Sequence, residues 1–291
     1  MIKTAGKKLK HYFSLVKFSH TIFALPFALA GFFLASSQGG QEFSIRTLIF
    51  VVLCMVFARS AAMSFNRYAD HRYDEMNPRT KNREIPSGII SRREALSIVI
   101  ISSVLFIFTT SMINRLTFIL SPVALTIILG YSFTKRFTSL CHFILGLGLS
   151  LAPIGAYISV TGRFDILPLI YSGIVLTWVG GFDIIYSLQD DEFDKKHNLF
   201  SLPALTGRRK SLRLSVLSHV MTTILVIAAG LAGNGSYLFW VGALIFTGLL
   251  VLQHSIVRHD DLSRVTLAFS TTNGAAGLIF ALFVILDLYL K

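Results

Sequence analysis

The sequence predicts an all-α integral membrane protein in which nine transmembrane helices surround a central cavity. Of the 291 residues, 53% are hydrophobic and only 14% are charged, about half the charged share of a soluble domain. The mean hydropathy is +0.66. The apolar residues are grouped into stretches of about 20, the length that crosses a bilayer as a helix. This composition excludes a cytosolic globular enzyme, a disordered protein and a nucleic-acid-binding domain.

The apolar stretches follow one another without a hydrophilic domain between them, so residues 1–291 are expected to form a single polytopic membrane domain. A lipid-exposed backbone has to satisfy its own hydrogen bonds, and the stretches are therefore predicted to be helical. Lysines before the first stretch resemble a signal peptide, but the later stretches favour a retained first helix. The predicted spans cover residues 18–37, 46–66, 95–113, 116–134, 140–161, 166–188, 213–233, 236–257 and 265–288.

The basic residues predict the orientation of these helices. With a cytoplasmic N-terminus, 22 of the 27 Lys and Arg fall at the cytoplasmic end and four at the other. Because cytoplasmic loops carry an excess of Lys and Arg, we expect the N-terminus and these loops on the cytoplasmic side of the membrane. This orientation explains the net charge of +12 without a nucleic-acid partner. The expected partner is the lipid bilayer, and no obligate protein partner is expected. Twelve of the 15 Asp and Glu also lie at the cytoplasmic end, and the rule for Lys and Arg does not explain why the acids gather there.

The first acidic motif follows the second predicted span. Asn66, Asp70 and Asp74 are spaced i, i+4, i+8, which places their side chains on one stripe of a helix. Two carboxylates and an amide at this spacing repel one another unless a cation lies between them. Such oxygen ligands suit Mg²⁺ that is bridged to a substrate phosphate. The alternative is a solvated helix end whose acids pair with Arg67 and Arg72.

A second acidic motif follows the sixth predicted span. Asp183, Asp190 and Asp194 are spaced i, i+7, i+11 and are also predicted to share one helical stripe. Asp183 follows an apolar run, and a carboxylate at membrane depth is a functional candidate. The two motifs, at residues 66–74 and 183–194, are related by a shift of 120 residues. We therefore expect a parallel pseudo-repeat with two acidic stripes that face each other across the cavity, at the cytoplasmic face.

Basic side chains accompany both acidic motifs, and Mg²⁺-binding acids beside Lys and Arg describe a diphosphate site. Arg59 lies seven residues before Asn66 and therefore on the same helix face, where an intramembrane cation needs an anionic partner. For the loop bases, the alternative explanation is membrane topology alone. The predicted diphosphate-binding residues are Arg72, Lys81, Arg83, Lys135 and Arg136.

Together, the two motifs resemble those of the UbiA superfamily of intramembrane aromatic prenyltransferases. The matching patterns are Asn-x3-Asp-x3-Asp from Asn66 and Asp-x2-Tyr-x3-Asp-x3-Asp from Asp183, and the similarity covers nearly the whole chain. Residues 25–29 and 82–88 are similar to the bacterial 4-hydroxybenzoate polyprenyltransferase branch. Arg67 departs from the family pattern, because many members have Asp there. The resulting Asn-Arg-Tyr sequence resembles the branch that serves menaquinone synthesis through futalosine.

The resemblance implies Mg²⁺-dependent transfer of a polyprenyl group from polyprenyl diphosphate to a ring carbon of an aromatic acid, in ubiquinone or menaquinone biosynthesis. The acceptor is either similar to 4-hydroxybenzoate or, in the futalosine variant, a carboxylated naphthalene. The long isoprenoid tail explains a membrane location, because it prefers lipid to water. The metal ligands that the resemblance implies are Asn66, Asp70, Asp74, Asp190 and Asp194.

The same resemblance implies catalytic roles. Asp183, the deepest of the acids, either removes the ring proton or helps to bind metal. Asp190 would complete the metal clamp, and Lys135 would stabilise the departing diphosphate. Arg59 would meet the carboxylate of the acceptor, and Tyr186 would position the diphosphate or the acceptor.

Two other classes of function fit part of the sequence. A cation-coupled transporter would also contain intramembrane charges, but its binding residues are expected near the bilayer midplane at broken helices. Here the acids cluster at one face. A non-catalytic membrane scaffold gives no reason for two Asp stripes, and its function would survive neutralisation of Asp70 or Asp190.

Overall fold

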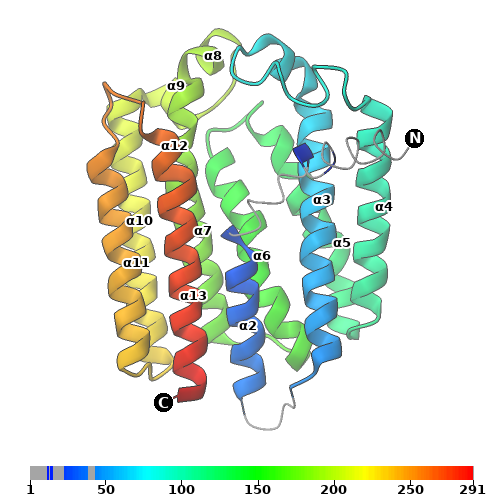
Figure 1. Ribbon diagram of the computed structural model, residues 1–291, viewed down its shortest axis with the longest axis vertical. Helices are drawn as coiled ribbons and strands as arrows, with labels where there is room; N and C mark the ends of the chain where they lie inside the picture. Colours follow the sequence, from blue (N-terminus) through cyan, green and yellow to red (C-terminus); the bar gives the residue numbers. More distant parts are fainter. Residues whose placement is uncertain (1–11, 13, 16–22, 39–42, 291) are drawn as a thin grey trace, which may run out of the picture.

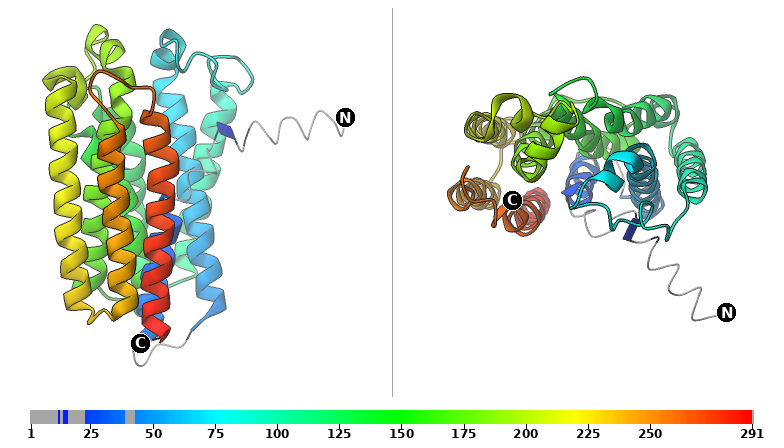
Figure 2. Two further views of the ribbon diagram at one scale, coloured as in Figure 1. Left: turned by 60° about the vertical axis from the view of Figure 1, so that its left-hand side comes forward. Right: turned by 90° about the horizontal axis from the view of Figure 1, so that it is seen from above.

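The computed structural model describes residues 12, 14, 15, 23–38 and 43–290, and this part of the chain contains helices but no strand. The long helices run side by side along one axis (Figure 1) and form a ring when seen from above (Figure 2). The helices of ten or more residues are α2 Leu25–Ser37, α3 Ile45–Met76, α4 Arg92–Ser111, α5 Arg115–Thr134, α6 Cys141–Thr161, α7 Ile166–Ser187, α10 Arg208–Ala232, α11 Tyr237–Ile256 and α13 Asn273–Leu290.

Eight helical segments of the described chain are long and apolar enough to cross a membrane, whereas nine were predicted. Each corresponds to one predicted span, in the predicted order. The remaining predicted span, 18–37, is represented by α2, an apolar helix of 13 residues. The first part of that span lies outside the described residues. The all-helical membrane architecture is confirmed, and the ninth span is described only in part.

The helices begin and end at residues that satisfy free backbone groups. Ser91 and Glu94 form a reciprocal capping box at the start of α4. Asn114 begins α5 by accepting a hydrogen bond from the backbone N–H of Thr117 at 3.0 Å. Gly162 ends α6 with φ of 66°, a left-handed conformation that glycine adopts at little cost.

Close backbone approach and interhelical hydrogen bonds hold α7 between α6 and α10. A Cβ atom on Gly146 of α6 would lie 2.4 Å from the Leu176 carbonyl oxygen of α7, so only glycine fits there. On the other side, Ser215 Oγ donates to the Gly181 carbonyl at 2.7 Å, and Ser218 Oγ donates to the Thr177 carbonyl at 2.6 Å. Small residues and such bonds are typical of helix packing in lipid.

The segments that carry both acidic motifs lie at the same end of the bundle, at the top of Figure 1. Helix α3 continues to Met76, ten residues beyond its predicted end at residue 66, and therefore carries the whole first motif. The second motif corrects the prediction of one continuous stripe. Helix α7 ends at Ser187, a 3-10 turn covers Leu188–Asp190, and α8 (Asp191–Lys196) follows, before α9 (Leu202–Thr206).

The last membrane segment is also interrupted. The short helix α12 (Val265–Leu267) leads into a π-helical turn (Ala268–Thr272) before α13 begins. Asn273 closes this turn by donating from its amide to the Ala268 carbonyl at 2.9 Å, and its amide oxygen accepts a bond from Trp178 of α7 at 3.1 Å. The buried asparagine thus ties the final segment to the centre of the bundle.

Candidate active site

The first motif lies on α3, as its spacing predicts. The Asn66 amide donates a hydrogen bond to Asp70 Oδ2 at 3.0 Å. Arg136, which follows α5, donates from one terminal nitrogen to Asp70 Oδ1 at 3.2 Å and to the Ala69 carbonyl at 2.7 Å. Arg136 therefore fixes both the side chain and the backbone at the start of the motif.

Asp74 is buried and is approached by two arginines. The loop after α3 folds back, so that Arg83 donates to Asp74 Oδ1 at 2.6 Å. Arg67, only 3% exposed, has a terminal nitrogen 3.8 Å from Asp74 Oδ2. The residue that departs from the family pattern thus places a buried positive charge beside the last acid of the motif.

Asp190 is held by residues from the loop after α3. Arg79 donates from Nε to Asp190 Oδ1 at 2.9 Å and from a terminal nitrogen to Oδ2, and Asn77 donates to Oδ1 at 2.9 Å. Arg79 also donates to the Tyr186 hydroxyl at 2.9 Å. Burial lowers the pKa of Arg79, but its bonds to Asp190 raise it more, so the pKa lies above its ordinary value. These contacts join the two motifs.

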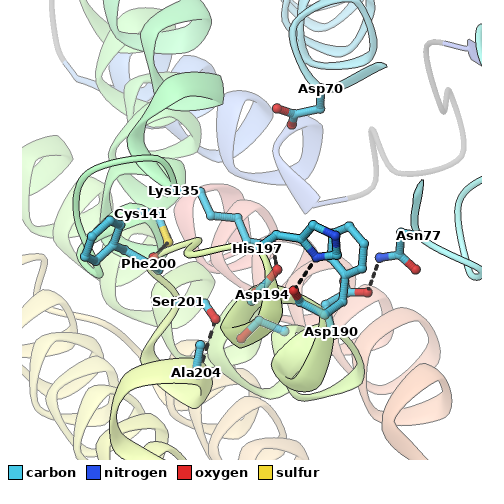
Figure 3. A network of polar contacts seen from close by, with 12 residues as sticks. Asp70, Asn77, Lys135, Cys141, Asp190, Asp194, His197, Phe200, Ser201 and Ala204 are labelled. Carbon is cyan, nitrogen blue, oxygen red and sulfur yellow. Dashed lines mark hydrogen bonds and ion pairs between the residues drawn. The ribbon is translucent and has the colours of Figure 1, made fainter. Parts of the chain in front are cut away.

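Lys135, directly after α5, lies between the motifs (Figure 3). Its ammonium nitrogen is 2.7 Å from Asp194 Oδ1, and Asp194 is fully buried. Lys135 also interacts electrostatically with Asp190 and Asp70. Burial lowers the pKa of Lys135, whereas the Asp194 carboxylate raises it more, so the ammonium stays charged at neutral pH. One cation therefore lies within range of acids from both motifs.

Each of the four predicted metal-binding aspartates is thus paired with a base. Within the described residues, no three His, Cys, Asp or Glu side chains converge closely enough to hold a metal ion by themselves. One buried oxygen nevertheless has no hydrogen-bond donor, Oδ2 of Asp74, whose nearest basic nitrogen lies 3.8 Å away on Arg67. Mg²⁺ usually takes one or two carboxylates together with water and substrate phosphate. The oxygen donors fit that kind of site, in which a phosphate supplies the remaining ligands.

Asp183 lies deeper along α7 and faces the same region. Its Oδ2 accepts a hydrogen bond from His142 Nδ1 of α6 at 2.7 Å. Tyr131 of α5 interacts electrostatically with Asp183, with Asp70 and with Arg59. Tyr131 therefore lies within electrostatic range of one acid from each motif and of the intramembrane arginine.

Below this point, a cavity of about 340 Å³ runs between α3, α4, α5 and α6. Arg59 and Tyr131 lie at its polar end, and Thr110 and Phe164 mark the end nearest the opposite side of the bundle. The remaining lining side chains are mostly aliphatic or aromatic. The bundle thus contains an apolar chamber that adjoins a strongly charged site.

The structure gathers most of the predicted site residues but not all of them. Arg72 and Lys81 are exposed, and in the described part of the chain neither forms an ion pair with a motif carboxylate. The sequence patterns did not single out Arg79, which contacts Asp190. They missed Asn77 and His142 altogether. For His142 a signal existed, since an ionisable side chain inside an apolar span is a functional candidate.

Comparison with known proteins agrees with this geometry. The model of the UbiA prenyltransferase family matches residues 24–284. The chain belongs to this family. It is 33% identical to a 4-hydroxybenzoate octaprenyltransferase of Aliivibrio fischeri over 80% of the chain and 81% of that protein. It is 31% identical to the protein of that name from Nitrosospira multiformis over 96% of both chains.

Solved structures of UbiA proteins have the same fold. The apo structure of a UbiA homolog from Aeropyrum pernix superimposes with a TM-score of 0.83 and 32% identity, covering 92% of this chain and 98% of that one. A UbiA homolog from Archaeoglobus fulgidus, bound to GPP and Mg²⁺, superimposes with a TM-score of 0.67 and 20% identity over 94% and 99% of the chains. This UbiA chain is therefore a multi-pass membrane prenyltransferase.

Proposed function

We propose that this UbiA protein transfers a polyprenyl group from polyprenyl diphosphate to a ring carbon of 4-hydroxybenzoate in ubiquinone biosynthesis, with Mg²⁺ as cofactor. The observation that carries the proposal is that two acidic motifs, with four of their aspartates paired with bases, lie next to an apolar cavity that Arg59 and Tyr131 line. The names of the relatives at about 30% identity support the acceptor. A cation-coupled transporter does not explain why every motif acid is paired with a base.

The donor would bind between the motifs. Asn66, Asp70, Asp74, Asp190 and Asp194 would hold Mg²⁺, which when bound neutralises the diphosphate and its growing negative charge. The bases that now pair with these acids would then turn to phosphate oxygens. Lys135, Arg83 and Arg136 are placed for this role by their ion pairs with the acids. Arg79, which bonds both Asp190 and the Tyr186 hydroxyl, would hold Asp190 in place at the edge of the site.

The acceptor would bind deeper, at the end of the chamber that Arg59 and Tyr131 line, within electrostatic range of Asp183. Arg59 supplies the cation that an aromatic carboxylate needs at membrane depth. The C–O bond of the donor breaks with its electron pair leaving on the diphosphate, and the allylic carbon bonds to the ring. Asp183 takes the displaced ring proton, and the C–H electron pair restores the aromatic ring. The apolar walls keep water from the allylic cation, and aromatic faces stabilise it.

The orientation of the protein in the membrane follows from its charge. The excess of Lys and Arg at the end that carries the motifs supports a site that opens toward the cytoplasm. The bacterial relatives support a bacterial inner membrane. The donor's tail would remain in the lipid phase, since each buried CH₂ favours it by about 0.8 kcal/mol. A second acceptor, a carboxylated naphthalene for menaquinone through futalosine, is favoured by one observation. Arg67 replaces an acid of the family pattern and lies buried beside Asp74.

The test uses the purified chain in detergent with Mg²⁺, labelled polyprenyl diphosphate and the two acceptors in parallel reactions. Asp70→Asn and Asp190→Asn should abolish product, whereas Asp260→Asn, an exposed acid outside both motifs, should retain it. The preferred acceptor decides between the two quinone pathways. Mg²⁺-dependent diphosphate binding without product from either acceptor would refute both acceptors. Absence of that binding would refute the prenyltransferase mechanism.

A further inference from the structure

A buried histidine contacts the deepest acid of the site. The side chain of His142, in the first turn of α6, is 3% exposed, and that of Asp183 is 20% exposed. The neighbours of Asp183 on α7, Phe182 and Ile184, are almost completely buried in the bundle. Asp183 is therefore partly exposed while its neighbours in the helix are buried, and His142 of α6 forms a hydrogen bond with its carboxylate.

The hydrogen bonds of His142 define which ring nitrogen carries the proton. The backbone N–H of Leu202 points at His142 Nε2 from 3.3 Å, so this nitrogen accepts. The other nitrogen, Nδ1, must then carry the hydrogen that it donates to Asp183 Oδ2 at 2.7 Å. Asp183 Oδ2 thus accepts a hydrogen bond from His142 Nδ1.

Helices α6 and α7, which carry His142 and Asp183, are closely packed. One turn after His142, a Cβ on Gly146 would lie 2.4 Å from the Leu176 carbonyl oxygen. One turn before Asp183, a Cβ on Gly180 would lie 2.7 Å from the Phe143 ring. The contact between His142 and Asp183 therefore joins two closely packed backbones, which favours one orientation of the carboxylate.

We propose that His142 is a positioning residue for proton removal by Asp183, an inference that rests on the proposed function. His142 occupies Oδ2, which leaves Oδ1 to receive the ring proton after the allylic carbon has bonded to the ring. The C–H electron pair returns to the aromatic system, and the proton passes from Asp183 to water when the product leaves.

The test compares His142→Leu with His142→Asn. Leucine removes the donor, whereas the asparagine amide can donate from near the position of Nδ1. His142→Leu should lower turnover on the order of 10- to 100-fold, the cost of about 1 Å of misplacement. Proton removal should then limit the rate, so a ring-deuterated acceptor should show a primary isotope effect that is larger than in the wild type. Mg²⁺-dependent diphosphate binding should be unchanged, and His142→Asn should recover most of the turnover.

Two further variants separate positioning from folding. His219→Leu removes another buried histidine that contacts α7, with Nε2 3.2 Å from the Trp178 carbonyl, and should leave the isotope effect at its wild-type value. In an Asp183→Asn background, His142→Leu should cause no additional loss, because both act on one proton transfer.

Three results would overturn the inference. The first is wild-type turnover and isotope effect in His142→Leu, and the second is turnover in His142→Asn as low as in Asp183→Asn. The third is a loss of turnover in His142→Leu that is accompanied by equal loss of diphosphate binding. If His142→Leu does not fold, His142→Asn and Asp183→Asn alone decide. Absence of prenylated product from the wild type would instead refute the proposed function, and the inference with it.

Discussion

Replacing Arg79 by methionine tests the contact that joins the two motifs. The Asp190 side chain is only 10% exposed and accepts two hydrogen bonds from Arg79 and one from Asn77. Arg79→Met keeps much of the side-chain volume but removes two of the three bonds and the positive charge. Breaking one partner of a buried ion pair costs about 3–5 kcal/mol. Because Arg79 is 31% exposed, we expect about 3 kcal/mol.

The assay is equilibrium unfolding in mixed detergent micelles, followed by the reaction of the two cysteines, Cys54 and Cys141, with a thiol reagent. The double variant Arg79→Met/Asp190→Asn should lose only about 1 kcal/mol, because no unpaired carboxylate remains and the amide can still bond Asn77. The coupling free energy of the pair is therefore expected to be about 2 kcal/mol.

Arg209→Met is the matched control, because Arg209 is exposed on the same end of the bundle. It should change the free energy of unfolding by less than about 0.5 kcal/mol. The reasoning is refuted if Arg79→Met is as stable as Arg209→Met. It is also refuted if the double variant is as unstable as Arg79→Met alone. The loss of stability would then come from packing rather than from the unpaired Asp190 carboxylate.

Two further predictions concern helix packing and pH. Gly146→Val should separate α6 from α7 and lower the yield of monodisperse protein in size-exclusion chromatography, whereas Gly130→Val, with open space around its Cβ, should not. The ion pair of Lys135 with Asp194 raises the pKa of the lysine above 10.5. Its contribution to stability should therefore be constant below that pH and decline only above it. Unfolding of wild type and Lys135→Met compared from pH 7 to 11 should show a converging difference at the alkaline end.

The parts of the fold and site that could be predicted are those that local spacing determines. Apolar length set the spans, and the i, i+4 spacing placed Asn66 and Asp70 on one face of α3, where they are hydrogen-bonded. The second motif failed this test, because its longer spacing assumed that α7 continues. A 3-10 turn at Leu188–Asp190 interrupts the α-helix instead, so the side chains after it no longer follow the α-helical spacing. A spacing of seven or eleven residues is informative only where the helix is unbroken.

The partners of the acids could not be predicted, because they are tertiary contacts. Arg79 and Asp190 are 111 residues apart, and His142 and Asp183 are 41 apart. From the sequence alone, each basic residue of the loops was an equally good candidate to form an ion pair with each acid. The choice depends on how the loop after α3 folds over the end of α7, which no local pattern specifies. Only the structure shows that Arg83 contacts Asp74 while Lys81, two residues earlier, is exposed to solvent.

The pairing of acids with bases has a consequence for how the substrates bind. With Asp74, Asp194 and Asp70 paired to Arg83, Lys135 and Arg136, Mg²⁺ alone would meet carboxylates that are already paired, and diphosphate alone would meet bases that are already paired. When both are present, these acids would hold the metal and these bases would hold the diphosphate. Each should therefore raise the affinity of the other by the same factor, roughly 5- to 150-fold. Calorimetric titration of Mg²⁺ with and without a non-hydrolysable diphosphate measures this factor. Equal Mg²⁺ affinity in both titrations would mean that the ion pairs persist in the bound state and that the bases do not hold the diphosphate.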